Sequence, residues 1–178
     1  LLLNEQSANI EKNGKQVFRF GFGQSPFPIS PALKQALIEN ADRKEYTQVQ
    51  GLEALRTQVA QYHSIFEKRP ISADQVFIAP GSKALLYTIM CAYTDAAVLI
   101  PAPAWVSYEP QAKLLGHATF MMQTSFEQRY RITPDILEKT LIEAAKNYKS
   151  LLVFLNSPGN PDGLCYSDQE LRALSAVL

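Results

Sequence analysis

The sequence predicts an α/β fold: a three-layer sandwich in which helices cover both faces of a mostly parallel sheet. Short apolar runs, each about the length of a strand, alternate along the chain with longer segments of helical periodicity. These runs are apolar at successive positions, as strands buried on both faces are. This favours a parallel sheet over an antiparallel one.

The predicted elements follow from local signals. Ser30 followed by Pro31 suits the N-cap and first position of a helix, and Ser167 with Glu170 predicts a capping box before the last helix. The helix at 81–93 is almost wholly apolar, so we expect it to be buried. The predicted strands are "QVFIAP" (75–80), "AAVLIP" (96–101), "HATFMM" (117–122) and "SLLVFL" (150–155), and the predicted helices are 31–40, 51–67, 81–93, 104–115, 133–148 and the segment after Ser167.

Composition excludes several classes of protein. The chain has 178 residues, enough for one domain with a substantial core, and its 17 basic residues equal its 17 acidic ones. This balance gives no indication of a nucleic-acid partner or an anionic membrane partner. The longest apolar stretch, "AAVLIPAPAWV", is interrupted by Pro101 and Pro103 and is shorter than the roughly 20 residues of a membrane span. We therefore expect neither a nucleic-acid nor a membrane partner, and a cytoplasmic location.

The cysteines and histidines show no metal or disulfide pattern. Cys91 and Cys165 are isolated, without a CxxC motif, which is typical of a protein from a reducing compartment. His63 and His117 have no partner at ligand spacing, so we interpret them as surface or packing residues. The chain opens without Met and stops inside a helical pattern, "ELRALSAVL", so we expect it to be a piece of a longer protein.

Three strand ends carry candidate binding residues. In "APGSKALL", Gly81 allows a tight turn, and Ser82 and Lys83 begin a helix whose unpaired N–H groups and dipole suit a phosphate. The alternative is an ordinary strand–helix turn, and the sequence lacks the GxxxxGK[ST] pattern of a Walker loop. In "PAPAWVSYEP", Trp105 is either a lid on the core or a flat face for a planar ligand.

The third strand end is "NSPGNPDG" (156–163). Pro161 disfavours helical backbone angles at Asn160, so the carboxamide of Asn160 is held at the end of a strand, available to a ligand oxygen. The alternative is a plain loop of turn-forming residues. Taken together, the three sites describe a phosphate cradle, a stacking ring and a polar contact on one edge of one sheet.

Five segments in the same order resemble the N-terminal portion of the fold-type I, pyridoxal-phosphate-dependent aminotransferases of class I/II. "NSPGNPDG" is similar to the family's N-x-P-x-N-P-[TS]-G, and "PAPAWVSYEP" to its P-x-P-x-[WYF]-x-x-Y-x-P. "KEYTQVQGLEALR" resembles its Y-x-x-x-x-G-x-x-x-L-R element. "GSKALL" resembles its phosphate-binding helix start, and "FGFGQSPFPIS" its first strand with G-x-P-x-F. The resemblance covers essentially the whole chain, and it implies the family's large domain in incomplete form.

The resemblance implies a role for each matching residue. Ser82 and Lys83 would hold the phosphate of pyridoxal 5'-phosphate, Trp105 would stack on its ring, and Asn160 would hydrogen-bond the ring's 3-oxygen. Tyr46 would reach the phosphate bound by the neighbouring subunit of a homodimer.

The resemblance further implies that Gly23 lines the pocket for the substrate carboxylate. The substrates would be an amino acid and a 2-oxo acid, and the reaction the transfer of an amino group between them. We expect residues 1–50 to form an N-terminal segment with the first strand, and residues 51–178 the first part of the cofactor-binding large domain.

The chain departs from the family pattern in two ways. Asp162 stands where Thr or Ser is usual, a mild change because Asp also hydrogen-bonds its own backbone in turns. The family's Schiff-base lysine, ring-nitrogen aspartate and carboxylate-binding arginine are expected beyond Leu178. Lys83 lies at the phosphate end of the ring and does not replace that lysine, so we expect this chain alone to be inactive.

Other functions remain open at the level of sequence. Lyases, decarboxylases and cyclising synthases of the same fold type share these motifs, and a non-catalytic binding or regulator domain would keep the cofactor contacts without the reaction. The amino donor and acceptor do not follow from these residues.

Overall fold

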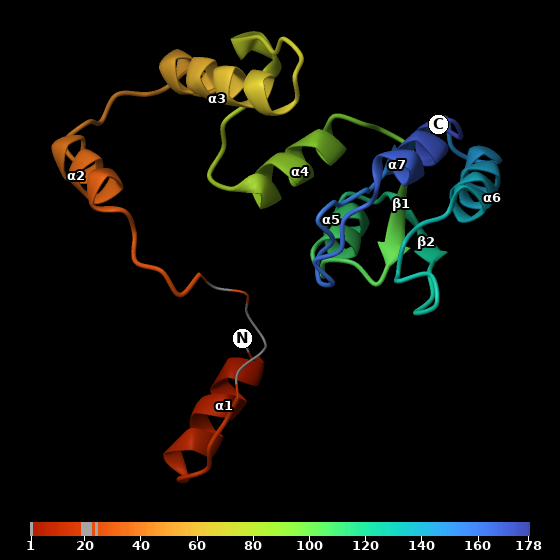
Figure 1. Ribbon diagram of the computed structural model, residues 1–178, viewed down its shortest axis with the longest axis horizontal. Helices are drawn as coiled ribbons and strands as arrows, with labels where there is room; N and C mark the ends of the chain where they lie inside the picture. The colour runs from red at the N-terminus through yellow and green to blue at the C-terminus, as the bar shows by residue number, and fades with distance from the viewer. Residues whose placement is uncertain (1, 19–22, 24) are drawn as a thin grey trace. The chain divides into compact units, whose positions relative to one another are not determined.

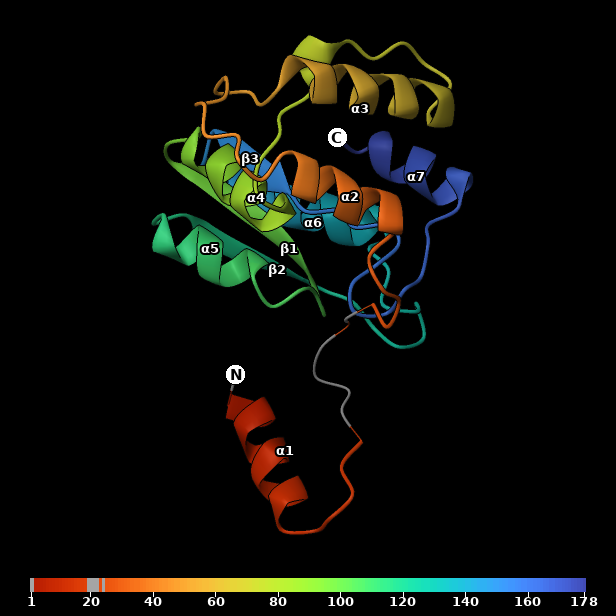
Figure 2. The ribbon, with the colours of Figure 1, turned by 90° about the vertical axis from the view of Figure 1, so that its left-hand side faces the viewer.

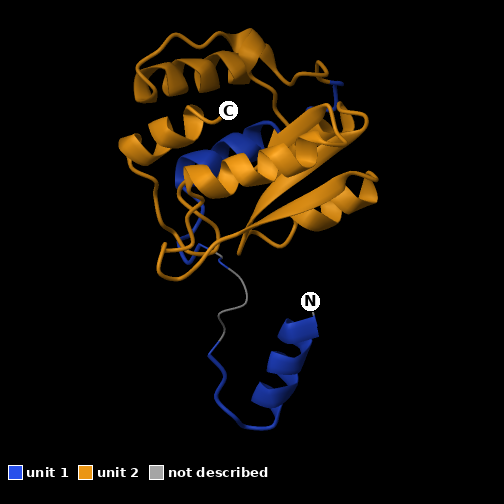
Figure 3. Ribbon diagram, turned by 90° about the vertical axis from the view of Figure 1, so that its right-hand side faces the viewer, with its two compact units in different colours: residues 1–46 blue, residues 47–178 orange. Residues whose placement is uncertain are grey.

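The computed structural model describes residues 2–18, 23 and 25–178, and the chain divides into two compact units, Leu1–Tyr46 and Thr47–Leu178 (Figure 3). The first unit holds helices α1 (Leu2–Lys12) and α2 (Pro31–Glu39). Residues 19–22 and 24, on which much of the predicted first strand falls, lie outside the described residues.

Helix α1 was not predicted, whereas α2 begins at Pro31 as predicted. Ser30 occupies the N-cap position as predicted, although its side chain makes no capping hydrogen bond. At the C-terminal end of α2, the Asn40 side chain donates to the Ala36 carbonyl oxygen at 2.8 Å.

The second unit contains a small parallel sheet and the helices that cover it (Figure 1). The strand order is β2-β1-β3, and both pairings of the central strand are parallel. The elements of this unit are α3 (Glu53–Phe66), a 3₁₀ turn η1 (Ala73–Gln75), α4 (Ser82–Cys91), β1 (Ala96–Ala102), α5 (Tyr108–Leu114), β2 (Ala118–Gln123), α6 (Pro134–Ala145), β3 (Ser150–Val153) and α7 (Asp168–Ser175).

Strand β1 is buried on both faces, as the sequence predicted. Ala97 and Leu99 point into one apolar cluster, which includes residues of α6 and α7. Val98 and Ile100 point into a second cluster, which includes residues of α4 and α5. Because neighbouring residues of a strand face opposite sides, these two clusters are the two interfaces of a three-layer sandwich. Figure 2 shows the helices of both layers beside the sheet.

The predicted strand at 75–80 is not a strand in the structure. Its first residue belongs to η1, Val76 has extended backbone angles, and Pro80 lies in a bend; the Ile78 N–H donates to the Gln50 carbonyl oxygen at 2.9 Å. A strand needs a neighbour, and within the described residues this run pairs with none of β1–β3.

The prediction that the helix at 81–93 is buried was also wrong in part. Among the residues of α4 only Met90 is fully buried, and Ile89 is 53% exposed. The inner face of α4 packs in the second apolar cluster. The helix predicted at 104–115 starts later, at Tyr108, because Trp105–Ser107 form a turn before it.

A buried arginine joins the start of α3 to the segment before α4. Arg56 is 6% exposed, and its guanidinium donates to the carbonyl oxygens of Gly51 at 3.2 Å and Ala73 at 2.9 Å. Gly51 has φ +100°, and a Cβ there would lie 2.5 Å from the Cβ of Ile78. A glycine is therefore required at this crossing of two segments.

Candidate functional site

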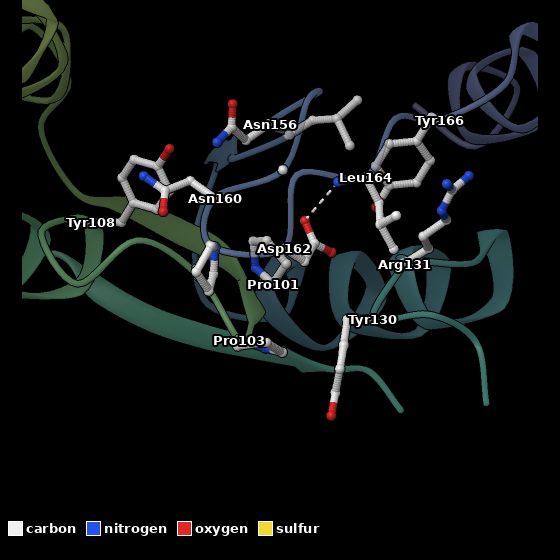
Figure 4. Close-up of a pocket in the computed structure, with 14 residues that line it drawn as sticks. Pro101, Pro103, Tyr108, Tyr130, Arg131, Asn156, Asn160, Asp162, Leu164 and Tyr166 are labelled. Atoms are coloured by element: carbon white, nitrogen blue, oxygen red, sulfur yellow. Dashed lines mark hydrogen bonds between the residues drawn. The ribbon is translucent and has the colours of Figure 1, made fainter. Parts of the chain in front are cut away.

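The loops that follow the three strands meet at the carboxyl edge of the sheet, where parallel sheets bind their ligands. Residues from all three loops line one pocket (Figure 4). Its volume is about 30 Å³. The lining residues are Pro101 in β1, Pro103, Ala104 and Tyr108 after it, Tyr130 and Arg131 after β2, and Leu155, Asn156, Gly159, Asn160, Pro161, Asp162, Leu164 and Tyr166 after β3.

The start of α4 forms an open helix N-terminus. Gly81 precedes it with φ +97°, an angle that favours glycine, and a Cβ at this position would have nothing within 4 Å. Ser82 and Lys83 form the first turn, and both are exposed. The N–H groups of a first turn have no partner within the helix, so an anion can approach them here.

Trp105 lies beside this helix start. The Lys83 Nζ is 5.6 Å from the centroid of the indole ring, a cation–π contact. Tyr108 meets the indole edge-on with ring centroids 5.4 Å apart, and Tyr108 in turn stacks on Phe154 at 4.3 Å. Burial raises the pKa of Tyr108. This aromatic row connects the turn after β1 to the end of β3, two residues before Asn156.

The turn that carries Asn160 is held by its own residues. The Asn156 carboxamide, oriented with its oxygen toward the Asn160 N–H, accepts from that group at 3.1 Å and donates to the Pro158 carbonyl oxygen at 3.2 Å. Asp162 Oδ1 accepts from the Leu164 N–H at 3.2 Å (Figure 4), which confirms that Asp162 bonds its own turn. Asn160 itself is exposed at this turn.

A second set of contacts braces this turn against the loop after β2, and the sequence did not predict it. Tyr166 accepts from the Ile132 N–H at 2.9 Å through its hydroxyl and donates its own N–H to Ser157 Oγ at 3.2 Å. Arg131 lies over the Tyr166 ring, with Cζ 5.3 Å from the centroid, and pairs with Glu170 at 2.6 Å. Burial raises the pKa of Tyr166. The Ser167–Glu170 capping box was predicted and is confirmed.

The structure brings some of the predicted site residues together. Lys83 contacts Trp105, Trp105 contacts Tyr108, and Tyr108 and Asn160 line the same pocket. Ser82 is adjacent to Lys83 in the first turn of α4.

Tyr46 and Gly23 belong to the first unit, and both are exposed. Their implied roles, at the phosphate of the neighbouring subunit and in the carboxylate pocket, stay predictions.

The histidines and cysteines take no part in this site. His117 is buried, with Nε2 3.0 Å from the Met90 carbonyl oxygen, and His63 is half-exposed beside Glu67 at 3.3 Å. Cys91 and Cys165 are free and exposed. In the part of the chain that the structure describes, no group of three or more His, Cys, Asp or Glu side chains could hold a metal ion.

Comparison with known proteins identifies the family of this chain. The sequence model of the family described as "Aminotransferase class I and II" matches residues 15–178. The chain belongs to this family. It is 30% identical to the asparagine–oxo-acid transaminase of Streptococcus mutans and 29% identical to the aspartate aminotransferase of Geobacillus stearothermophilus, over 98% and 99% of its length.

Solved structures show the same fold. The aspartate aminotransferase of Thermotoga maritima superposes with a TM-score of 0.85 at 27% identity over 98% of this chain, and that of Rhizobium meliloti with a TM-score of 0.86 at 26% identity. The chain spans less than half of these relatives: 44% and 45% of the two curated sequences, and 46% and 43% of the two structures. Among the described residues, none of the helices has both the length and the apolar character to cross a membrane.

Proposed function

We propose that this chain is the N-terminal part of a cytoplasmic, homodimeric aminotransferase that uses pyridoxal 5'-phosphate to move an amino group between an amino acid and a 2-oxo acid. The observation that carries the proposal is the contact of Lys83 with Trp105, which joins an open helix start to an aromatic face. Family membership and the order of the motifs support it. Aspartate and asparagine are the first amino donors to test, since relatives carry those names.

The groups present fit the proposed cofactor in kind. An open helix N-terminus, a hydroxyl and an ammonium suit a phosphate, an indole suits a pyridine ring, and a carboxamide suits a ring oxygen. Asn160 lines the 30 Å³ pocket, whereas Ser82 and Lys83 lie outside it, and all three residues are exposed. We propose that these three and Trp105 hold the cofactor on the open side of the second unit.

When bound, the cofactor supplies an electron-withdrawing ring for covalent amino-group chemistry. This chain would contribute binding and orientation: Lys83 neutralises the phosphate, and Asn160 donates to the ring oxygen from a turn that Asn156 fixes. We further propose that Tyr46 reaches the phosphate bound by the other subunit and that Gly23 lines the carboxylate pocket. In this proposal the N-terminal segment comprises residues 1–50, and the start of the large domain comprises residues 51–178.

Cofactor titration of the complete polypeptide tests the proposal. We expect Lys83→Met to weaken pyridoxal 5'-phosphate binding by about 10- to 100-fold, since hydrogen bonds to charged groups contribute about 1.5–3 kcal/mol. We expect Asn160→Ala to weaken it by about 3- to 10-fold. Lys149→Met and Asn147→Ala, at exposed positions of the same residue types, are the matched controls.

Two results would contradict the proposal: no saturable binding of the cofactor by the complete protein, or losses in the site variants no larger than in the controls. The 178-residue chain by itself should show no transaminase activity, and purified chain that transfers amino groups would refute that part.

A further inference from the structure

Gln111 is a buried polar residue that the proposed site does not use. It lies on α5, is 8% exposed, and its Nε2 donates to the Lys83 carbonyl oxygen at 3.0 Å across 28 residues of sequence. Its Oε1 is buried and has no hydrogen-bond partner among the described residues. A buried acceptor without a partner costs stability, so an apolar side chain of the same size would pack here without that cost.

The bond from Gln111 joins two segments that carry different parts of the site. Lys83 is in the first turn of α4, and Trp105 precedes α5 on the segment that holds Gln111. Main-chain hydrogen bonds link the Trp105 turn to α5. The Tyr108 N–H donates to the Trp105 carbonyl oxygen at 3.2 Å, and the Gln111 N–H donates to the Ser107 carbonyl oxygen at 3.2 Å. The Gln111 carboxamide therefore fixes the start of α4 relative to the indole.

A second bond holds the other end of the same helix. His117, just after α5, has Nε2 3.0 Å from the Met90 carbonyl oxygen in the last turn of α4. The side chain of Met90 is itself buried in the apolar cluster shared with α5. The C-terminal end of α4 is thus fixed by packing as well as by His117, whereas at its exposed N-terminal turn the Gln111 side chain donates a hydrogen bond to the Lys83 carbonyl oxygen.

We propose that Gln111 is a positioning residue that sets the distance between the phosphate-binding start of α4 and the ring-stacking face of Trp105. The inference rests on the proposed function. In a rigid molecule the phosphate and the ring lie at a fixed distance, so the protein groups that bind them must also lie at a fixed distance. If the start of α4 shifts, the ligand can keep its phosphate contacts or its ring contacts, but not both. A ligand with a ring and no phosphate does not make this demand.

The test is Gln111→Met in the complete polypeptide, with Gln169→Met, at an exposed position of α7, as the matched control. Dissociation constants are measured for pyridoxal 5'-phosphate and for pyridoxal, together with the melting temperature without ligand. We expect Gln111→Met to weaken pyridoxal 5'-phosphate by about three- to tenfold, the range for one hydrogen bond. Pyridoxal should change less than twofold, because it lacks the phosphate.

The melting temperature should change little, because the substitution removes an unpaired buried oxygen along with the hydrogen bond. A second variant, Gln111→Glu, places a carboxylate against the Lys83 carbonyl oxygen. Its loss of affinity for the phosphorylated ligand should exceed that of Gln111→Met at pH 8. The loss should shrink toward acid pH, relative to the wild-type protein, as the carboxyl gains a proton that it can donate.

The outcomes separate the two levels of the proposal. Failure of the wild-type protein to bind pyridoxal 5'-phosphate overturns the proposed function. Binding by the wild type with equal affinity in Gln111→Met overturns the positioning role alone. Equal losses for both ligands, accompanied by a lower melting temperature, also overturn it, because they indicate a purely structural residue.

Discussion

Replacing Arg56 by Met should open the start of the second unit locally. The guanidinium donates to the main-chain carbonyl oxygens of Gly51 and Ala73 and to Gln48 Oε1 at 3.2 Å. Met fills much of the volume of the arginine stem and makes none of these bonds. The two carbonyls are left without the donor that ties residues 48–51 to η1.

The size of the effect follows from these contacts. Hydrogen bonds to a charged group contribute about 1.5–3 kcal/mol each, and removal of one partner leaves the others desolvated. The ion pair with Asp74 adds little, since it is 3.8 Å long and the Asp74 side chain is 93% exposed. Two main-chain carbonyls therefore give an expected loss of about 3–6 kcal/mol in the free energy of local opening.

Hydrogen exchange measured by mass spectrometry on the complete protein reports this opening. The Ile78 N–H is bonded to the Gln50 carbonyl oxygen across the same junction, so a peptide covering residues 73–80 should exchange about 100-fold faster or more in Arg56→Met. Arg69→Met is the control, because Arg69 is 60% exposed and pairs with Glu67 at the surface. Exchange in Arg56→Met no faster than in Arg69→Met would show that Arg56 does not hold the junction.

Two further predictions concern stability. Gly51→Ala should destabilise the protein in urea by about 1–3 kcal/mol more than Gly116→Ala: both positions have positive φ, but only the new Cβ at Gly51 meets Ile78, and equal losses would exclude that steric clash as the cause. The pKa of Glu170 is lowered, chiefly by the hydrogen bond from the Ser167 N–H, so its contribution to stability is present above about pH 4.5 and lost as pH falls through the lower folded value. Glu170→Gln should therefore flatten the decline of melting temperature toward acid pH, and an unchanged slope would contradict the assignment.

The elements that the sequence predicted well are those with a strong local pattern. Strands β1 and β2 appear within two residues of their predicted ends, because an apolar run between turn residues has few alternatives. The segment 75–80 carries the same kind of pattern and is not a strand, because a strand depends on a neighbour as well as on its own residues. Helix α1 was not predicted, and none of its described residues is buried.

The contacts of the site divide in the same way. Ser82, Lys83, Trp105 and Asn160 were predicted from short motifs and from the family that those motifs resemble. The bonds that brace them were not predicted, because they join residues far apart: 28 positions separate Gln111 from Lys83 and 39 separate Arg131 from Glu170. Such pairs depend on how helices pack on the sheet, which no local pattern encodes.

The register of the sheet connects the core to the site. Leu99 of β1 pairs with Val153 of β3, so Ala102 and Asn156, each three residues further on, leave the sheet at the same edge. A slip of β1 by one residue would exchange the two faces that it buries, moving Leu99 out of one apolar cluster and into the other. The packing that prevents this slip therefore also fixes the level at which the turns bearing Trp105 and Asn160 begin. A substitution among the buried residues of β1 that changes the register should therefore displace Trp105 and Asn160, although it alters neither residue.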